Sequence, residues 1–225
     1  MKRFSEIGEE LRQVLAGRLG AMLDAALPPL AYLLGRQLCC TDLGLRLAVL
    51  AALVVVLIRL MLRQSIAAAL AGLVIALGAG ALAIVSVQAA NFFLPGLLSS
   101  GLVAALSILS LVLNKPLAAW SSYLARGWPL DWYWHPQIAP AYRNVTAAWS
   151  LVFLGRFLLQ YAFYAQGAAG ALGAAQLLLG WPLIIVLLIG TYLYGTWKLG
   201  RLGGPSVQEF RAGAPPPWQG QIRGF

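Results

Sequence analysis

Residues 114–160 read NKPLAAWSSYLARGWPLDWYWHPQIAPAYRNVTAAWSLVFLGRFLLQ. This stretch joins an aromatic, basic loop to an apolar segment that carries one charge, Arg156. The eleven residues before Arg156 are uncharged, and no further charge follows up to Gln166. A helix of about 20 predominantly apolar residues spans the hydrocarbon core of a bilayer. The stretch therefore predicts a transmembrane helix with an ionisable group near its middle.

The composition of the whole chain also indicates a membrane protein. Of its 225 residues, 60% are hydrophobic and 10% are charged, whereas about 25% of the residues of a soluble domain are charged. Uncharged runs cover residues 66–87, 92–113 and 168–197. Such runs predict helices, because backbone groups in lipid must be hydrogen-bonded within their own segment. We expect an all-α fold, a polytopic bundle of transmembrane helices.

Six spans are predicted, and Pro28 and Pro29 should bend the first of them. The expected bounds are about 19–35, 43–62, 66–88, 92–113, 144–165 and 171–197. Residues 19–200 thus form a transmembrane domain. Residues 1–18 lack the apolar core of a cleavable signal peptide and predict an amphipathic interfacial helix. Residues 201–225 are rich in Gly and Pro and predict a disordered or extended tail.

Residues 114–143 are too polar, and too often interrupted by proline, to cross the membrane. They contain four tryptophans, a residue type that concentrates at the headgroup level, so we expect these side chains to anchor the loop in the interface. The expected anchors are Trp120, Trp128, Trp132 and Trp134. Before them, Asn114, Lys115 and Pro116 form a candidate structural motif that ends the preceding span.

Arg156 is the candidate centre of a polar site inside the membrane. A central arginine costs about 2.5 to 3.5 kcal/mol on insertion scales, so it should face other helices or a hydrated cavity. It is either a structural arginine bound to neighbouring carbonyls and amides, or part of an anion or proton site. The other candidates are Gln160 on the same face, Arg59, Asn91 and Asp24. Asp24 is either wetted at the interface or the counter-charge of Arg59 or Arg156.

Other chemistries find little support. Cys39 and Cys40 have no histidine nearby, and we interpret them as small buried apolar residues rather than metal ligands. His135 is the single histidine and lacks the partners of a catalytic or metal site. The sequence has no Gly-rich phosphate loop with its lysine. We therefore expect no catalytic residue, no metal, no cofactor and no enzymatic activity.

The basic residues predict the orientation. With six spans and both termini on one side, that side holds thirteen of the sixteen Lys and Arg residues, and the other holds only Arg36 and Arg46. An excess of Lys and Arg marks cytoplasmic loops, so both termini and the aromatic loop are expected in the cytoplasm. Topology and lipid contacts account for the net charge of +9, and no nucleic-acid partner is expected.

A weak internal similarity relates two sets of three spans. VLIRLMLRQ resembles FLGRFLLQY and aligns Arg59 with Arg156, while LPPL in the first span resembles LPGL in the fourth. Three-span repeats are inverted relative to each other, as in many secondary transporters, and hold a site at their interface. Two inverted three-helix repeats are therefore a hypothesis for this chain.

FFLPGLLSSGLVAALSILSLVLNKPLAAW, the tryptophan-bearing loop, TAAWSLVFLGRFLLQYAFY and LGWPL together resemble an uncharacterised group of six-span bacterial membrane proteins, best represented in actinobacteria. The chain is more distantly similar to the intracellular septation protein A family, where a span likewise ends in an Asn-basic-Pro-Leu motif. Lys115 stands where arginine is expected in much of the family. The resemblance implies a bacterial cytoplasmic (inner) membrane protein concerned with envelope maintenance or small-solute movement, and it transfers no catalytic residue.

Two functions remain open. The first is a small transporter or carrier with a polar site around Arg156. The second is a non-catalytic scaffold or accessory subunit of a larger membrane complex, which docks its partner through the aromatic loop and the tail. A shortage of acidic groups for ion coupling speaks against the first, and an unpaired central arginine speaks against the second. Membrane lipids are expected partners in both cases, and a homo-oligomer or larger complex is compatible with either.

Overall fold

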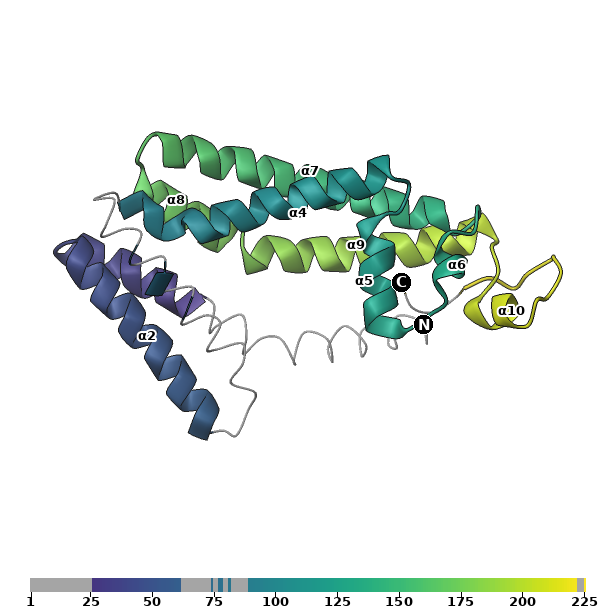
Figure 1. The fold of residues 1–225 in the computed structure, drawn as a ribbon, viewed down its shortest axis with the longest axis horizontal. Helices are drawn as coiled ribbons and strands as arrows, with labels where there is room; N and C mark the ends of the chain where they lie inside the picture. The colour runs from purple at the N-terminus through teal and green to yellow at the C-terminus, as the bar shows by residue number, and fades with distance from the viewer. Residues whose placement is uncertain (1–25, 62–73, 75–76, 79–80, 82–88, 222–224) are drawn as a thin grey trace. The chain divides into compact units, whose positions relative to one another are not determined.

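The computed structural model describes residues 26–61, 74, 77–78, 81, 89–221 and 225 (Figure 1). All regular elements of these residues are helices. The chain divides into two compact units. The first unit comprises the chain up to Leu97 together with Gln160–Pro182, and the second comprises Leu98–Leu159 and Leu183–Phe225.

Four helical stretches within the described residues are long and apolar enough to cross a membrane. They are Thr41–Met61 (α2), Ala89–Val112 (the 3-10 helix η1, Ala89–Phe93, and α4, Leu94–Val112), Ala139–Ala165 (α7) and Ala169–Leu202 (α8, Ala169–Leu178, and α9, Trp181–Leu202). The shorter helices are α5 (Leu117–Arg126), α6 (Leu130–Tyr133) and α10 (Val207–Arg211). In the part that the structure describes, the chain is thus an all-helical, multi-pass membrane protein.

The two remaining predicted spans fall largely outside the described residues. The first is described only from residue 26 onward, as a helix of residues 26–38, and of the third only four positions are described. The predicted N-terminal helix of residues 1–18 lies outside the described part altogether. The prediction of six spans therefore stays a prediction.

The last predicted span consists of two helices rather than one bent helix. α8 ends at Leu178, and Leu179 and Gly180 separate it from α9. Pro182 lies in the first turn of α9, where proline is tolerated because the N–H it lacks would have no partner inside the helix. The break therefore precedes the Trp181-Pro182 pair at which a bend was expected.

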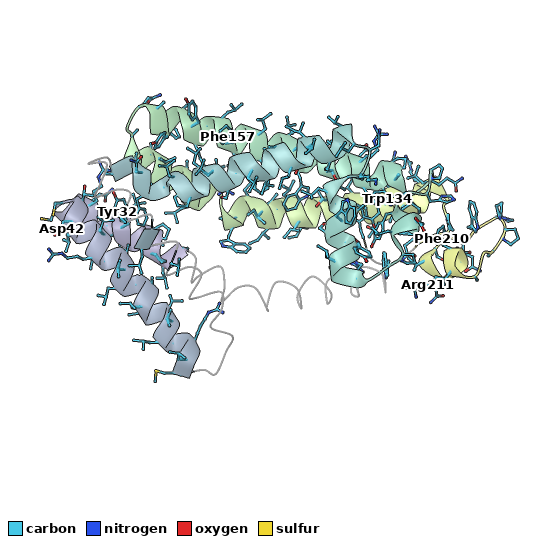
Figure 2. The ribbon with its side chains drawn as sticks, in the orientation of Figure 1. Tyr32, Asp42, Trp134, Phe157, Phe210 and Arg211 are labelled. Carbon is cyan, nitrogen blue, oxygen red and sulfur yellow. The ribbon has the colours of Figure 1, made fainter. Side chains whose placement is uncertain are left out.

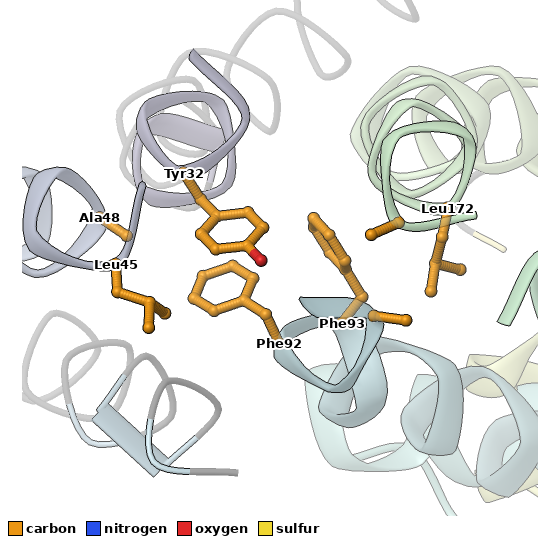
Figure 3. Close-up of a cluster of buried hydrophobic side chains, with 8 residues drawn as sticks. Tyr32, Leu45, Ala48, Phe92, Phe93 and Leu172 are labelled. Carbon is orange, nitrogen blue, oxygen red and sulfur yellow. The ribbon is translucent and has the colours of Figure 1, made fainter. Parts of the chain in front are cut away.

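Three aromatic rings form the centre of the first unit (Figure 3). Tyr32, from the helix of residues 26–38, stacks on Phe92 of η1 with ring centroids 4.1 Å apart. Phe93 meets these two rings edge-on, at 5.4 Å from Tyr32 and 5.2 Å from Phe92. The Tyr32 hydroxyl also donates to the Ala89 carbonyl oxygen at 3.1 Å. Because each such ring pair adds about 0.5 to 1.5 kcal/mol beyond burial, this cluster fixes η1 against the helix of residues 26–38.

Glycine lets the helices of the first unit approach closely. A Cβ added at Gly35 would lie 2.7 Å from the Cα of Gly44 in α2, so the two backbones touch at this crossing. A Cβ at Gly173 of α8 would lie 2.7 Å from the Phe93 ring. The side-chain amide of Gln176, also on α8, donates to the Phe93 carbonyl oxygen at 2.6 Å. Small residues combined with interhelical hydrogen bonds are the usual means of packing helices in a membrane.

In the second unit, Asn114, Lys115 and Pro116 form the corner between α4 and α5. Asn114 has a φ of 55°, in the left-handed region that asparagine tolerates better than most residues. Its N–H donates to the Leu111 carbonyl oxygen at 3.1 Å, and the Lys115 N–H donates to that of Ser110 at 2.9 Å. These two bonds make a Schellman motif, which satisfies the last carbonyls of α4. The motif therefore ends one helix and sets the start of the next.

The centre of the second unit is aromatic and contains Trp132, which is fully buried. Its ring lies edge-on to Tyr133 at 5.1 Å and to Tyr142 at 6.3 Å. The indole N–H donates to the Pro205 carbonyl oxygen at 2.8 Å. The prediction that Trp132 is an interfacial anchor is wrong, because this carbonyl satisfies its one polar group inside the protein. Of the other expected anchors, Trp120 is 37% exposed, and Trp128 and Trp134 are partly buried.

The tail is folded as far as residue 221, so the expectation of a disordered or extended chain is wrong for this part. Its helix α10 starts with a capping box, in which the Ser206 hydroxyl accepts from the Glu209 N–H and the Glu209 carboxylate accepts from the Ser206 N–H. The second carboxylate oxygen accepts from the Gln219 N–H at 2.7 Å. Phe210 of α10 and Trp134 of the loop pack against the same aromatic cluster (Figure 2). The Glu209 carboxylate therefore joins Ser206 to Gln219 and holds the intervening tail residues in a folded loop, which composition alone did not predict.

Cys39 and Cys40 occupy the turn between the helix of residues 26–38 and α2. Both are free and exposed, so the interpretation of a buried apolar pair is wrong. The Cys39 N–H donates to the Gly35 carbonyl oxygen, and the Cys40 carbonyl oxygen accepts from the Gly44 N–H, each at 3.1 Å. The pair thus bridges the end of one helix and the start of the next, and loops of this kind lie at the surface.

Candidate functional site

Arg156 lies in α7, the helix that contains the segment with the isolated charge. Its side chain is partly buried, and its Nε is fully buried with no hydrogen-bond partner among the described residues. The guanidinium carbon lies 5.8 Å from the centre of the Phe153 ring, one turn earlier. Such a contact contributes about 0.5 to 2 kcal/mol and uses the charge without using an N–H donor. The arginine is thus placed by an aromatic ring, while its buried Nε–H stays available.

A row of side chains on one face of α7 supports this contact. Trp149 stacks on Phe153 with ring centroids 5.7 Å apart and planes at 12°. The Trp149 indole N–H donates to the Thr191 hydroxyl of α9 at 3.4 Å, and this hydroxyl donates to the Leu187 carbonyl oxygen at 2.6 Å. Positions 149, 153 and 156 share a helix face by their spacing. That spacing could have indicated Trp149 from sequence, but nothing in the sequence indicated Thr191.

Further polar contacts fix α7 within the second unit. The Asn144 side-chain amide donates to the Tyr194 hydroxyl of α9 at 2.7 Å. The Thr146 hydroxyl accepts from the Ala118 N–H of α5 at 3.1 Å and donates to the Tyr142 carbonyl oxygen at 2.8 Å. Hydrogen bonds between membrane helices average about 0.6 kcal/mol each. Together they orient α7 against α5 and α9, and hence orient the row that ends at Arg156.

The described carboxylates have other roles. Asp42 forms an ion pair with Arg46 on α2 at 2.6 Å, and Glu209 caps α10. Asp131 is exposed in the aromatic loop. Asp24, the predicted counter-charge, lies outside the described residues. Within the part of the chain that the structure describes, Arg156 therefore has no ion pair with a carboxylate.

The other predicted site residues belong to the first unit. Gln160, one turn after Arg156 on α7, is fully buried. Asn91 of η1 is buried, and its side-chain oxygen accepts from the Tyr164 hydroxyl at 2.7 Å. Arg59 is partly exposed in the last turn of α2. The structure thus pairs Asn91 with Tyr164, a residue that the sequence analysis did not single out. Arg156 belongs to the second unit.

His135 belongs to the contact between the aromatic loop and the tail. Its Nδ1 accepts from the Gln137 N–H at 3.4 Å, and its ring lies edge-on to Trp218 at 5.4 Å. Among the residues that the structure describes, no three His, Cys, Asp or Glu side chains come together in a way that could hold a metal ion. Within the spans that the structure describes, Arg156 is the charged residue that has a buried side-chain nitrogen without a hydrogen-bond partner.

Comparison with known proteins gives a family for this arrangement. No curated protein and no solved structure matches the chain. Residues 15–197 match a family described as "Protein of unknown function (DUF3159)". The match covers the six predicted spans, the Asn-Lys-Pro corner and Arg156, and it ends within α9, before the folded tail. The chain belongs to this family, DUF3159, whose function is unknown.

Proposed function

We propose that the protein is a small transporter or carrier of the bacterial cytoplasmic membrane and that it binds an anionic solute at Arg156. The proposal depends on one observation, the Nε of Arg156, which is buried in a membrane-spanning helix without a hydrogen-bond partner among the described residues. Burying an uncompensated charge costs about several kcal/mol. An anion that accepts charge-assisted hydrogen bonds from the guanidinium would offset this cost.

The row of Trp149, Phe153 and Arg156 supports a site of defined geometry. The ring of Phe153 holds the guanidinium from one side, and Trp149 is held in turn by Thr191. A planar guanidinium fixed in this way favours anions that accept two parallel hydrogen bonds. The substrate class that fits is a small carboxylate or a phosphate-bearing metabolite.

The proposal includes the complete topology. The spans predicted at 19–35 and 66–88 would bring the four described stretches to six, with both termini in the cytoplasm. If the halves are inverted repeats, Arg59 is the counterpart of Arg156, and the substrate site lies where the two halves meet.

The experiment that tests the proposal follows thermal unfolding of the detergent-purified protein against a panel of small carboxylates, phosphate esters and inorganic anions. A ligand at 100 times its Kd stabilises the folded state by about 2.7 kcal/mol, which raises the Tm. We expect at least one anion to raise the Tm of the wild type, and we expect Arg156→Leu to lose that shift while Arg156→Lys keeps part of it.

The matched control is Arg143→Leu, which makes the same substitution at an exposed position of the same helix. It should keep the full anion-dependent shift. An equal shift in the wild type and in Arg156→Leu would contradict an anion site at Arg156, as would the absence of a shift with every anion of the panel.

A scaffold or accessory subunit is the alternative, and the folded tail favours it. Residues 203–221 pack on the aromatic loop and form a structured cap at one end of the second unit. Absence of any anion-dependent shift, together with a second protein that co-purifies in fixed stoichiometry and is lost when the cap is removed, would favour this function over transport.

A further inference from the structure

Phe225 fills a slot in the second unit between α7 and α9. Its ring stacks on Tyr142 of α7, with centroids 4.4 Å apart and planes at 13°. The ring also lies against Gly195 of α9, where any Cβ would collide with it. The main-chain oxygen of Phe225 accepts from an Nη of Arg126, in α5, at 3.1 Å. Three helices thus hold one aromatic ring and one oxygen.

The walls of the slot belong to the helices and not to the tail. Tyr142 is fully buried. Gly195 is also buried. Because it has no side chain, there is room for an aromatic ring beside Tyr142. Arg126 is exposed and rests on Trp128, with 4.9 Å from its guanidinium carbon to the ring centre. The slot therefore has three parts. The Tyr142 ring forms one wall, the space beside Gly195 accepts a second ring, and the exposed guanidinium of Arg126 binds an oxygen.

We propose that this slot is a binding site for a small aryl-alkanoate, which is a planar aromatic ring joined through two carbons to a carboxylate. Phe225 is then its intramolecular occupant. The ring position is defined by Tyr142 and Gly195, and the oxygen position by Arg126, at the separation that a phenylalanine side chain sets. Stacked rings contribute about 0.5 to 1.5 kcal/mol beyond burial, and an arginine donates strong, charge-assisted hydrogen bonds to a carboxylate.

Competition with Phe225 determines how the site behaves in the intact protein. A group tethered to the same chain acts at an effective concentration in about the millimolar range. A free aryl-alkanoate must displace it, so its apparent affinity for the wild type is reduced. The proposal is independent of any solute at Arg156, because the slot uses other residues.

The test measures binding of 3-(4-fluorophenyl)propionate by 19F NMR to detergent-purified full-length protein, with empty micelles as the reference. Phe225→Ala removes the occupant and keeps the walls. We expect this variant to bind the probe about tenfold more tightly than the wild type, as displacement of a tethered competitor requires. Adding Gly195→Val to Phe225→Ala fills the gap and should abolish binding.

A second arm keeps the test decisive if the double variant fails to fold. Phe225→Ala combined with Arg126→Gln changes only an exposed cation, and it should bind the carboxylate several-fold more weakly than Phe225→Ala alone. The neutral amide of the same probe should bind these two variants equally. Equal binding of the carboxylate by the wild type and Phe225→Ala would overturn the proposal, and so would binding that survives both second substitutions.

Discussion

Arg156 shows what a single residue reveals before its surroundings are known. An isolated charge in a long apolar run is visible in the sequence, and its position in the middle of a membrane helix follows from spacing alone. Its contact with Phe153 also follows, because residues three apart share a helix face. The Thr191 hydroxyl that holds Trp149 comes from another helix. No local pattern predicts such a partner.

Glu209 carries the prediction that belongs to the residue scale. Its carboxylate accepts N–H bonds from Gln219 and Ser206, which lower the pKa of the carboxyl group from 4.5 to about 2. Because the folded pKa lies below the ordinary one, the ionised carboxylate stabilises the folded tail above pH 4.5, and this stabilisation is lost as the pH falls through about 2. We expect the hydrogen-exchange protection factors of the Ser206 and Gln219 amides to fall across this interval.

Glu209→Gln is the matched variant for this prediction. It keeps the size of the side chain and removes the titration, so protection of both amides should be lower than in the wild type at neutral pH and should change little between pH 4.5 and 2. If the wild type and the variant show the same pH profile, Glu209 is not the group that holds the tail loop.

Helix ends were harder to predict than helix centres in this chain. The apolar runs located α2, α4 and α7, but α7 begins at Ala139, five residues before the predicted span, because proline at position 140 fits the first turn of a helix. α8 and α9 were predicted as one span, because the hydrophobic pattern of the sequence does not reveal a two-residue break between two equally apolar helices. The Asn-Lys-Pro stop at the end of α4 was correctly located, because it combines a left-handed residue type with a proline.

Asn114 supports a prediction about how α4 ends. With φ at 55°, a β-branched residue there costs about 1 to 2 kcal/mol, whereas glycine has no such penalty. We expect Asn114→Val to lower the Tm of the detergent-purified protein by several degrees and Asn114→Gly to leave it close to that of the wild type. Lys115→Ala, at the exposed neighbouring position, serves as the control. A Tm for Asn114→Val equal to that of Lys115→Ala would mean that this corner does not stabilise the fold.

At the scale of the whole molecule, composition predicted that the helices lie in a membrane, but it did not predict that the aromatic loop and the tail fold together. A chain with 10% charged residues and long apolar runs must build membrane helices, and this much follows from hydropathy. Burial of Trp132 and folding of the tail do not follow, because each depends on contacts between segments distant in sequence. The Trp132 N–H bond to Pro205 joins positions 73 residues apart. Tryptophan in a loop beside a membrane predicts an interfacial anchor until such a partner is known.

The orientation of the whole molecule can be tested at Cys39 and Cys40, the only cysteines of the chain. Both are exposed in the turn before α2, and the Leu43 N–H at the start of that helix lowers the pKa of the Cys40 thiol, which raises its thiolate fraction. The excess of basic residues on the side of the termini predicts that this turn lies on the outer face of the membrane. A membrane-impermeant maleimide should therefore label intact cells that express the wild type, and Cys39→Ser/Cys40→Ser should abolish the labelling.

A cysteine introduced on the opposite side completes the argument. In the Cys39→Ser/Cys40→Ser background, Arg211→Cys places one thiol at an exposed position of α10, which the same charge bias assigns to the cytoplasm. It should react only after the cells are permeabilised. Labelling of Arg211→Cys in intact cells, with protection of the native pair, would reverse the orientation. The six-span prediction puts five crossings between the two sites, so they should face opposite compartments. Labelling of both sites from the same side would require an even number of crossings between them and would contradict six spans.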